Sequence, residues 1–298
     1  MSTRRRFVLK CTFSCWCGNT ESIVFAAQMV FGRKFVVLRC PACSTHRIVP
    51  QAIRTDAEAA SHYSSRTADS GLGSYDKERR LQITNLAMRR MAQVGIHFTQ
   101  DMDVLDVGCA DAEKLWALKE KFGFAAVGLD VDEKALSRAK SMFPTIQLEK
   151  GTILDFASRT GRRFDVVVCS AIIEHVVDPI VFLKSVKCLL KPNGQVFLLT
   201  PNSASLHYYL LRAYWRELLA IGEHIFLFNA ESLNYCAHAA ALRMEQVSTS
   251  FDVTYPYLNM KDLKGSLFSL FMKLSKMISR TVSNEMQGDI LVARLQNE

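Results

Sequence analysis

A short acidic, glycine-containing segment holds the residues best placed for chemistry. The apolar run Val104–Val107 includes Asp106 and leads into the small-residue turn Gly108–Ala112. Asp130 follows at the end of the next expected strand. A strand, a tight turn and a helix N-terminus bring backbone amides close to a ligand, and an acid at this distance accepts both hydroxyls of a ribose. The pattern predicts a pocket for a nucleotide-like ligand.

A second cluster with chemical potential consists of cysteines near the N-terminus. Two pairs, spaced Cys-x-Cys and Cys-Pro-x-Cys, are separated by 22 residues of strand character. The second spacing aims two thiolates at one metal, whereas the first is one residue shorter than usual. Cys11 and His46 are alternative ligands, and reduced cysteines in a hairpin without metal are the plainer interpretation. We predict a structural zinc ribbon with four protein ligands: Cys15, Cys17, Cys40 and Cys43.

Length, composition and charge limit the classes of protein to which the chain can belong. The chain has 298 residues, 49% of them hydrophobic and 22% charged, with a formal net charge of +8. This length accommodates one large α/β domain and a small module. No apolar run approaches the roughly 18 residues that span a bilayer, so an integral membrane protein is not expected. Residues 1–60 carry nine lysines and arginines against three acids, a mild bias toward anionic partners.

The cysteines and the N-terminus favour a cytoplasmic protein. Cys109, Cys169 and Cys188 lie in apolar patterns, where a free thiol behaves as a small hydrophobe. The basic segment 3–8 has some likeness to a twin-arginine export signal, but polar residues interrupt the stretch that follows.

The chain divides into three predicted regions: a zinc-ribbon-like β module at 1–50, a linker or cover segment at 51–74, and a main domain at 75–298. In the main domain, strands alternate with helices. The expected strands are 102–107, 125–130, 146–148, 164–169 and 195–199, with late strands at 244–251 and 288–294. The expected helices are 75–95, 112–121, 132–142, 179–190, 206–220 and 230–241. This alternation predicts an α/β, Rossmann-like, doubly wound and mostly parallel sheet with its ligand at the carboxyl ends of the strands.

The motifs as a set resemble those of class I S-adenosylmethionine-dependent methyltransferases. The resemblance extends over roughly 75–298 and lies in segments 104–110, 128–130, 154–156, 164–168, 174–176, 190–194 and 200–202. A dehydrogenase-type dinucleotide fold fits less well, because the sequences after the fourth and fifth strands match methyltransferases. A relative that keeps the fold without binding the cofactor is the other alternative.

The resemblance implies cofactor-binding roles for seven residues: Asp106, Gly108, Ala110, Asp130, Val131, Asp155 and Phe156. Asp106 would orient the turn and the cofactor's ammonium, Asp130 would hold the ribose, and Asp155 would accept from the adenine amino group. Val131 would flank the adenine, and the backbone of Phe156 would read the ring. Ala110 and Ala112 stand where the family usually has glycine. Alanine at positive φ costs about 1 kcal/mol or more, so cofactor affinity depends on the conformation of this turn.

The acceptor side is read from the segment after the fourth strand. Segment 170–175 lacks both the Asn/Asp-Pro-Pro-aromatic motif and the Pro-Cys motif of base-directed enzymes. Glu174-His175 resembles the small-molecule group that includes quinone-pathway and sugar methyltransferases. His175 could deprotonate a hydroxyl near neutral pH, and His224 is the second candidate catalytic residue. Either histidine could instead be structural.

We therefore predict methyl transfer from S-adenosylmethionine to a small molecule, at a hydroxyl of a sugar, lipid-linked glycan or related metabolite. One alternative activity is RNA methylation, in which the basic ribbon would bind RNA. The other alternative is a binding protein that has no catalytic activity. Segment 261–280 has an amphipathic basic pattern. Such a helix packs on its own domain, contacts a partner helix or lies on a membrane surface.

Overall fold

The computed structural model describes residues 8–10, 15–30, 33–49, 58, 77–211, 215, 223–250 and 288–298. The chain forms two compact units. The first, here called the ribbon unit, comprises Met1–Ala52, Thr200–Tyr235 and Ser248–Leu291. The second, here called the sheet unit, comprises Ile53–Leu199, Cys236–Val247 and Val292–Glu298. The predicted linker 51–74 and amphipathic segment 261–280 lie outside the described residues, apart from residue 58.

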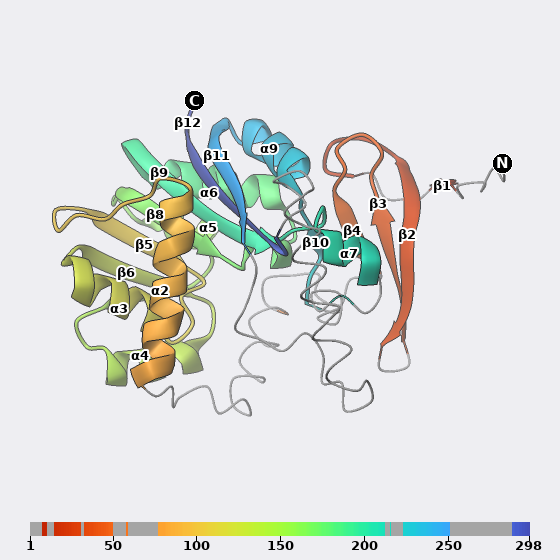
Figure 1. Cartoon of the computed structure of the whole chain (residues 1–298). Helices are drawn as coiled ribbons and strands as arrows, with labels where there is room; N and C mark the ends of the chain where they lie inside the picture. Colours follow the sequence, from red (N-terminus) through yellow and green to blue (C-terminus); the bar gives the residue numbers. More distant parts are fainter. Residues whose placement is uncertain are drawn as a thin grey trace. The chain divides into compact units, whose positions relative to one another are not determined.

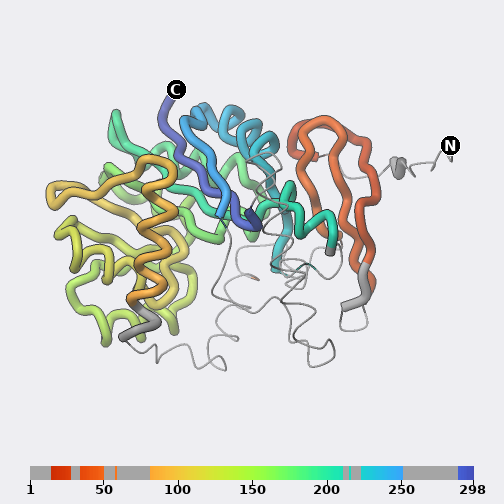
Figure 2. The backbone as a smooth tube through the Cα atoms, viewed as in Figure 1, coloured from red at the N-terminus to blue at the C-terminus, as the bar shows by residue number. Residues whose placement is uncertain are grey.

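The sheet unit is built around a mostly parallel sheet, which confirms the predicted fold class. Among the described residues it has seven strands in the order β11-β12-β9-β8-β5-β6-β7. The pairs β5–β6, β6–β7, β5–β8 and β8–β9 are all parallel. Figures 1 and 2 show the C-terminal strand β12 lying between β11 and β9. The strands are β5 Asp103–Val107, β6 Ala125–Asp130, β7 Gln147–Lys150, β8 Phe164–Ser170, β9 Leu190–Pro201, β11 Leu242–Ser250 and β12 Ile290–Asn297.

Helices connect these strands as the alternation predicts. α2 contacts α3, and α5 contacts α6. The central strands are buried on both faces, as parallel strands between helices must be: Leu105, Val127 and Val167 have no exposed surface. The helices of this unit are α2 Lys77–Gln93, α3 Glu113–Phe122, α4 Glu133–Met142, α5 Ile153–Arg159 and α6 Pro179–Cys188, with a 3₁₀ turn η1 at Ile173–His175. Helix α7 Leu206–Leu211 belongs to the ribbon unit, and α9 Ala230–Ala239 begins in the ribbon unit and ends in the sheet unit.

Strand β9 is longer than expected. Pro192-Asn193-Gly194 indicates a break before a strand at 195–199, yet β9 runs from Leu190 to Pro201. Its register explains the difference: Leu190 pairs with Phe164 and Gln195 with Val166, so residues 191–194 bulge out of the ladder. A bulge keeps the strand direction while interrupting the pairing.

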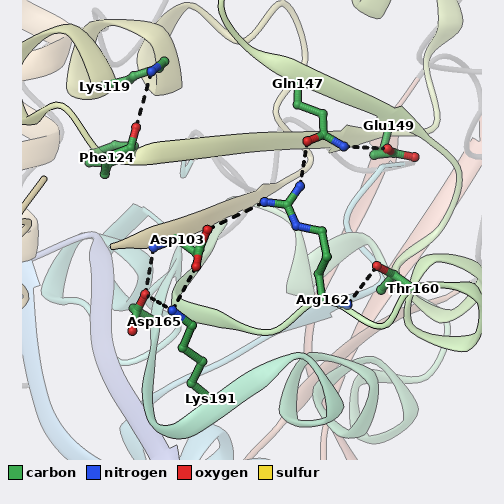
Figure 3. Close-up of polar contacts among 9 residues, drawn as sticks. All are labelled: Asp103, Lys119, Phe124, Gln147, Glu149, Thr160, Arg162, Asp165 and Lys191. Carbon is green, nitrogen blue, oxygen red and sulfur yellow. Dashed lines mark hydrogen bonds and ion pairs between the residues drawn. The ribbon is translucent and has the colours of Figure 1, made fainter. Parts of the chain in front are cut away.

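A polar network lies at the amino ends of strands β5 and β8, away from the carboxyl ends where the ligand is expected (Figure 3). Lys191 Nζ lies 2.9 Å from Asp103 Oδ2 and 2.7 Å from Asp165 Oδ2. Arg162 Nη2 lies 3.7 Å from Asp103 Oδ1. The amide of Asp103 also donates to Asp165 Oδ2 over 2.7 Å. The network therefore links β5, β8 and the bulge in β9.

The ribbon unit contains an antiparallel sheet. In the part of the chain that is described, its strands follow the order β1-β2-β3-β4-β10, and every neighbouring pair is antiparallel. Its buried core combines Phe35, Val37 and Ile48 with three residues far along the chain, namely Tyr208, Trp215 and Leu227. The strands are β1 Val8–Lys10, β2 Glu21–Val30, β3 Arg33–Arg39, β4 His46–Val49 and β10 Phe226–Leu227.

This compact unit is larger than the predicted module at 1–50. So short a segment has little core of its own, and residues after position 200 supply the missing apolar surface. The predicted domain boundaries stay a prediction. Over the described ranges, no helix is both long and apolar enough to cross a membrane.

Candidate functional site

A cavity opens at the carboxyl ends of β5, β6, β7 and β8 in the sheet unit. Its volume is about 370 Å³. The loops after the four strands contribute to its lining, including Gly108, Asp130, Gly151 and Ala171. At its rim, Leu154, Val177 and Val181 are more exposed than is usual for apolar side chains, at 52%, 40% and 41%. A bound ligand could cover this apolar surface.

The turn after β5 keeps a glycine-type backbone even where it has alanine. Gly108 has φ 73°, and a Cβ there would lie 2.8 Å from Ile172 Cδ1. Ala110 has φ 49° and Ala112 has φ 56°, so both alanines are in the left-handed region. The side chains therefore impose a strain of about 1 kcal/mol each instead of reshaping the turn.

Asp130 holds this strained turn in place. Its Oδ2 accepts a hydrogen bond from the amide of Ala110 over 2.7 Å, and its Oδ1 accepts one from the amide of Asp132 over 2.8 Å. Burial raises the pKa of Asp130, and the two amide donors oppose that effect. Because each oxygen has a second lone pair and the residue lines the cavity, Asp130 can also accept from a ligand.

Asp106 is a buried carboxylate with unmet hydrogen-bonding capacity. It is 1% exposed and is not among the residues that line the cavity, and neither oxygen has a hydrogen-bond partner among the residues that the structure describes. The Lys114 ammonium lies 3.6 Å from Oδ2. Burial raises the pKa of Asp106 in spite of this cation. A carboxylate in this state favours an approaching cationic donor, because such a partner would offset part of the cost of its burial.

The segment after β7 differs from the expected arrangement. Asp155 and Phe156 are not among the residues that line the cavity. Asp155 is exposed, and its carboxylate accepts from the hydroxyl of Thr152 over 2.8 Å, while Phe156 is 2% exposed in the core. Residues 151–154 line the cavity instead. Sequence reasoning missed them, although Gly151-Thr152 directly after a strand, with Thr152 capping α5, is a recognisable signal.

The two candidate catalytic histidines lie in different units. His175, the last residue of η1, lines the cavity and is half-buried. Glu174 beside it is 1% exposed. His224 belongs to the ribbon unit, where it is buried close before β10. The catalytic roles of both histidines stay predictions. Of the two, His175 is the one among the residues that line the cavity.

The four predicted zinc ligands come together in the ribbon unit. The Sγ atoms of Cys15 and Cys43 are 3.6 Å apart, and those of Cys17 and Cys40 are 3.5 Å apart. All four lie within 4.8 Å of one another. Zn–S bonds of about 2.3 Å in a tetrahedron place sulfurs about 3.8 Å apart, so the cluster matches a Cys₄ centre.

Local turns explain how the shorter pair reaches this geometry. The amide of Gly18 donates to the carbonyl of Cys15 over 2.8 Å, and Gly18 has φ 84°. On the other side, the amide of Ser44 donates to the carbonyl of Cys40 over 3.1 Å. The turn at Gly18 thus allows a Cys-x-Cys pair to complete the cluster.

The pKa of the Cys43 thiol is lowered to about 5, mainly by its hydrogen bond with Cys15.

Comparison with known proteins assigns the family. A family model described as "Methyltransferase domain" matches residues 75–247. With the strand–turn–acid geometry and the parallel sheet, this match shows that the chain belongs to the class I S-adenosylmethionine-dependent methyltransferases.

Curated relatives of similar sequence include O-methyltransferases. The chain is 34% identical over 158 residues to a ubiquinone biosynthesis O-methyltransferase of Actinobacillus pleuropneumoniae serotype 7, covering 48% of this chain and 67% of the relative. It is also 35% identical over 134 residues to the protein of the same name in Pseudomonas paraeruginosa, covering 41% and 56%.

Solved structures share the fold. A SAM-dependent methyltransferase from Archaeoglobus fulgidus has a TM-score of 0.51 at 17% identity, covering 72% of this chain and 93% of that one. Magnesium protoporphyrin IX methyltransferase from Synechocystis PCC 6803, with bound SAH, has a TM-score of 0.54 at 11% identity, covering 82% and 100%.

Proposed function

We propose that this enzyme methylates a hydroxyl group of a small molecule, such as a sugar, a lipid-linked glycan or a related metabolite. The observation that carries the proposal is the position of His175 on the same cavity as Gly108, Ala110 and Asp130. A half-buried imidazole beside a cofactor pocket can take the proton of an alcohol. The names of the O-methyltransferase relatives support oxygen as the acceptor atom.

The cofactor would occupy the cavity with its ribose on Asp130. Asp106 would meet the ammonium of the methionine end, and the backbone at Gly108 and Ala110 would lie along that end. Val131 and the 151–154 segment would flank the adenine, and the roles of Asp155 and Phe156 at the adenine stay predictions. The unpartnered oxygens of Asp106 and the close backbone at Gly108 fit such a ligand.

Catalysis then depends chiefly on alignment. When bound, S-adenosylmethionine supplies a methyl group already activated by its sulfonium. The protein must place the acceptor oxygen behind that methyl group and exclude water. His175 receives the hydroxyl proton as the oxygen attacks, so the proton leaves the acceptor without passing to bulk solvent.

The test uses purified full-length protein and methyl-labelled S-adenosylmethionine with a panel of acceptors. The panel contains nucleotide sugars, lipid-linked glycans, a hydroxylated quinone precursor and RNA. We expect label in a hydroxylated small molecule and at least about 100-fold lower turnover in His175→Gln, with cofactor affinity unchanged. Label in RNA alone would refute the proposal in favour of the RNA activity. Label in none, with no cofactor bound, would favour a non-catalytic relative.

We further propose that the cysteine cluster holds a structural zinc ion. Four thiolates would fill all four positions, which suits a structural and not a catalytic metal. Zinc content should be close to one per chain and should fall in Cys40→Ser, with a lower melting temperature. Cys188→Ser is the matched control, because Cys188 is exposed and remote in sequence from the cluster. A wild-type protein without zinc that keeps its full stability would refute the metal site.

A cytoplasmic location stays a prediction. None of the eight cysteines in the described residues forms a disulfide. A reducing compartment would keep them reduced.

A further inference from the structure

The chain turns from strand β8 to the segment that carries His175 at a single strained alanine. β8 ends at Ser170 and η1 begins at Ile173, so only two residues join them. The first of these, Ala171, has φ 57°, in the left-handed region, and it lines the cavity. Residues other than glycine rarely adopt this conformation, so the surroundings of Ala171 must hold it there.

Hydrogen bonds fix the backbone on both sides of this turn. The amide of Ala171 donates to the carbonyl of Leu199 in β9 over 2.8 Å, which continues the pairing of β8 with β9 beyond the end of β8. The amide of His175 donates to the carbonyl of Ile172 over 3.0 Å within η1. The backbone conformation of Ala171 therefore determines the direction in which η1 leaves the sheet.

The residues that follow Ala171 are packed, whereas its own side chain is exposed. Ile173 has no exposed surface. A Cβ at Gly108 would lie 2.8 Å from Ile172 Cδ1, so Ile172 packs against the turn after β5. Ile172 and His175 both line the cavity. Because the methyl group of Ala171 is exposed, the contribution of this residue lies in its backbone and not in side-chain packing.

We propose that Ala171 is a positioning residue, whose left-handed backbone directs His175 toward the cavity. This inference rests on the proposed function, that is, on the proposed role of His175 and the proposed cofactor placement. A residue that resists the left-handed conformation would turn η1 in another direction, and the imidazole of His175 would move away from the reacting methyl group. The requirement at position 171 is therefore tolerance of left-handed backbone and not a particular side-chain volume.

Two substitutions of similar size separate the backbone requirement from side-chain volume. Asparagine enters the left-handed region more readily than other residues with a side chain, whereas valine is β-branched and strongly disfavoured there. The test variants are Ala171→Asn and Ala171→Val. Ala241→Asn and Ala241→Val are the matched controls, because Ala241 has φ 55° directly before β11 in the same unit and is not among the residues that line the cavity.

The measurement is the NMR signal of the His175 ring in full-length protein with isotope-labelled histidine. His175→Gln identifies that signal by its loss. Spectra are recorded at one pH with saturating S-adenosylhomocysteine and with saturating S-adenosylmethionine. The two ligands differ by a methyl group and the positive charge of the sulfonium, so the difference between the two His175 signals depends on how close the imidazole lies to that charge.

We expect this signal difference to fall at least about threefold in Ala171→Val, because the effect of a charge weakens with distance. It should change less than about 1.5-fold in Ala171→Asn and in both Ala241 variants, whose backbone near His175 keeps its direction. Calorimetry with S-adenosylhomocysteine should give affinities within about threefold of each other for Ala171→Asn and Ala171→Val, which have side chains of similar size. Ala171→Thr, also β-branched, serves as a second variant if the valine variant does not fold.

The outcomes are distinguishable. An unchanged signal difference in the folded valine or threonine variant, with wild-type protein that binds both ligands, would overturn the role of Ala171 and leave the proposed function intact. An equal loss in Ala171→Asn and Ala171→Val would also overturn it, because side-chain volume would then be the cause. Failure of the wild type to bind either ligand, or a wild-type His175 signal that is the same in both complexes, would refute the proposed function and this inference with it.

Discussion

Replacing Asp106 by asparagine should leave the stability of the ligand-free protein almost unchanged while it weakens cofactor binding. Asp106 is 1% exposed, lacks hydrogen-bond partners in the described part of the chain, and lies 3.6 Å from the Lys114 ammonium. At an effective dielectric constant of about 20, two charges at that distance attract by roughly 4–5 kcal/mol. Removing a carboxylate from water costs several kcal/mol, so the two contributions nearly cancel.

The substitution removes both contributions together. We expect the free energy of unfolding of Asp106→Asn to lie within about 1 kcal/mol of the wild type, or above it. Lys114→Met is the contrasting variant, because it leaves the buried carboxylate without a counter-charge. It should lose about 3 kcal/mol, the low end for broken buried pairs, since Lys114 is partly exposed.

The assay is urea unfolding of the ligand-free protein followed by circular dichroism, with thermal melts as a check. A loss of about 3 kcal/mol corresponds to a melting temperature lower by roughly 6–12 °C in a domain of this size. Addition of S-adenosylhomocysteine should raise the melting temperature of the wild type and raise that of Asp106→Asn much less, because stabilisation follows ligand affinity.

The opposite order of stabilities would refute this reasoning. If Asp106→Asn lost more than about 3 kcal/mol while Lys114→Met lost nothing, Asp106 would be a satisfied structural acid. A variant that bound S-adenosylhomocysteine as tightly as the wild type would equally contradict the role of Asp106 at the ammonium.

Further predictions concern the turn, the ribose contact and the amino-end network. Asp130→Ala should weaken cofactor affinity at least about tenfold, because it removes the ribose acceptor and frees the amide of Ala110, and calorimetry giving an unchanged affinity would count against the pocket assignment. Ala110→Gly should raise the melting temperature by up to about 4 °C, since φ 49° strains alanine by about 1 kcal/mol, whereas a lower melting temperature would show that the turn is unstrained. Hydrogen bonds to Asp165 and Asp103 hold the pKa of Lys191 above its usual range, so their contribution to stability is complete below the unfolded pKa of about 10.4 and is lost as pH rises through the higher folded pKa. The difference in melting temperature between the wild type and Lys191→Met should therefore shrink above about pH 10, and a difference that widened there would contradict the network.

Much of the site could be predicted because the relevant signals are local. The apolar run before Gly108, the helix pattern after it and the acid at position 130 each follow from short-range periodicity. In a parallel sheet these positions meet at the carboxyl ends of adjacent strands, and β5 pairs with β6 so that Asp106 lies opposite Gly128. The spacing of the cysteine pairs similarly identified the cluster that the fold brings together.

Other features depend on contacts between residues distant in sequence, which periodicity does not encode. The carboxylate of Asp130 accepts a hydrogen bond from the amide of Ala110, twenty positions earlier in the chain. Ala110 has the left-handed backbone conformation that alanine by itself disfavours.

The ribbon unit shows the same division between local and distant information. The sequence by itself determined the cysteine turns and the alternating strands around them. Only the tertiary structure decided that Tyr208, Trp215 and Leu227 complete the core, because a short β module must bury its apolar face against whatever surface the rest of the fold supplies. Local sequence thus determines which elements form, whereas packing decides which side chains become neighbours.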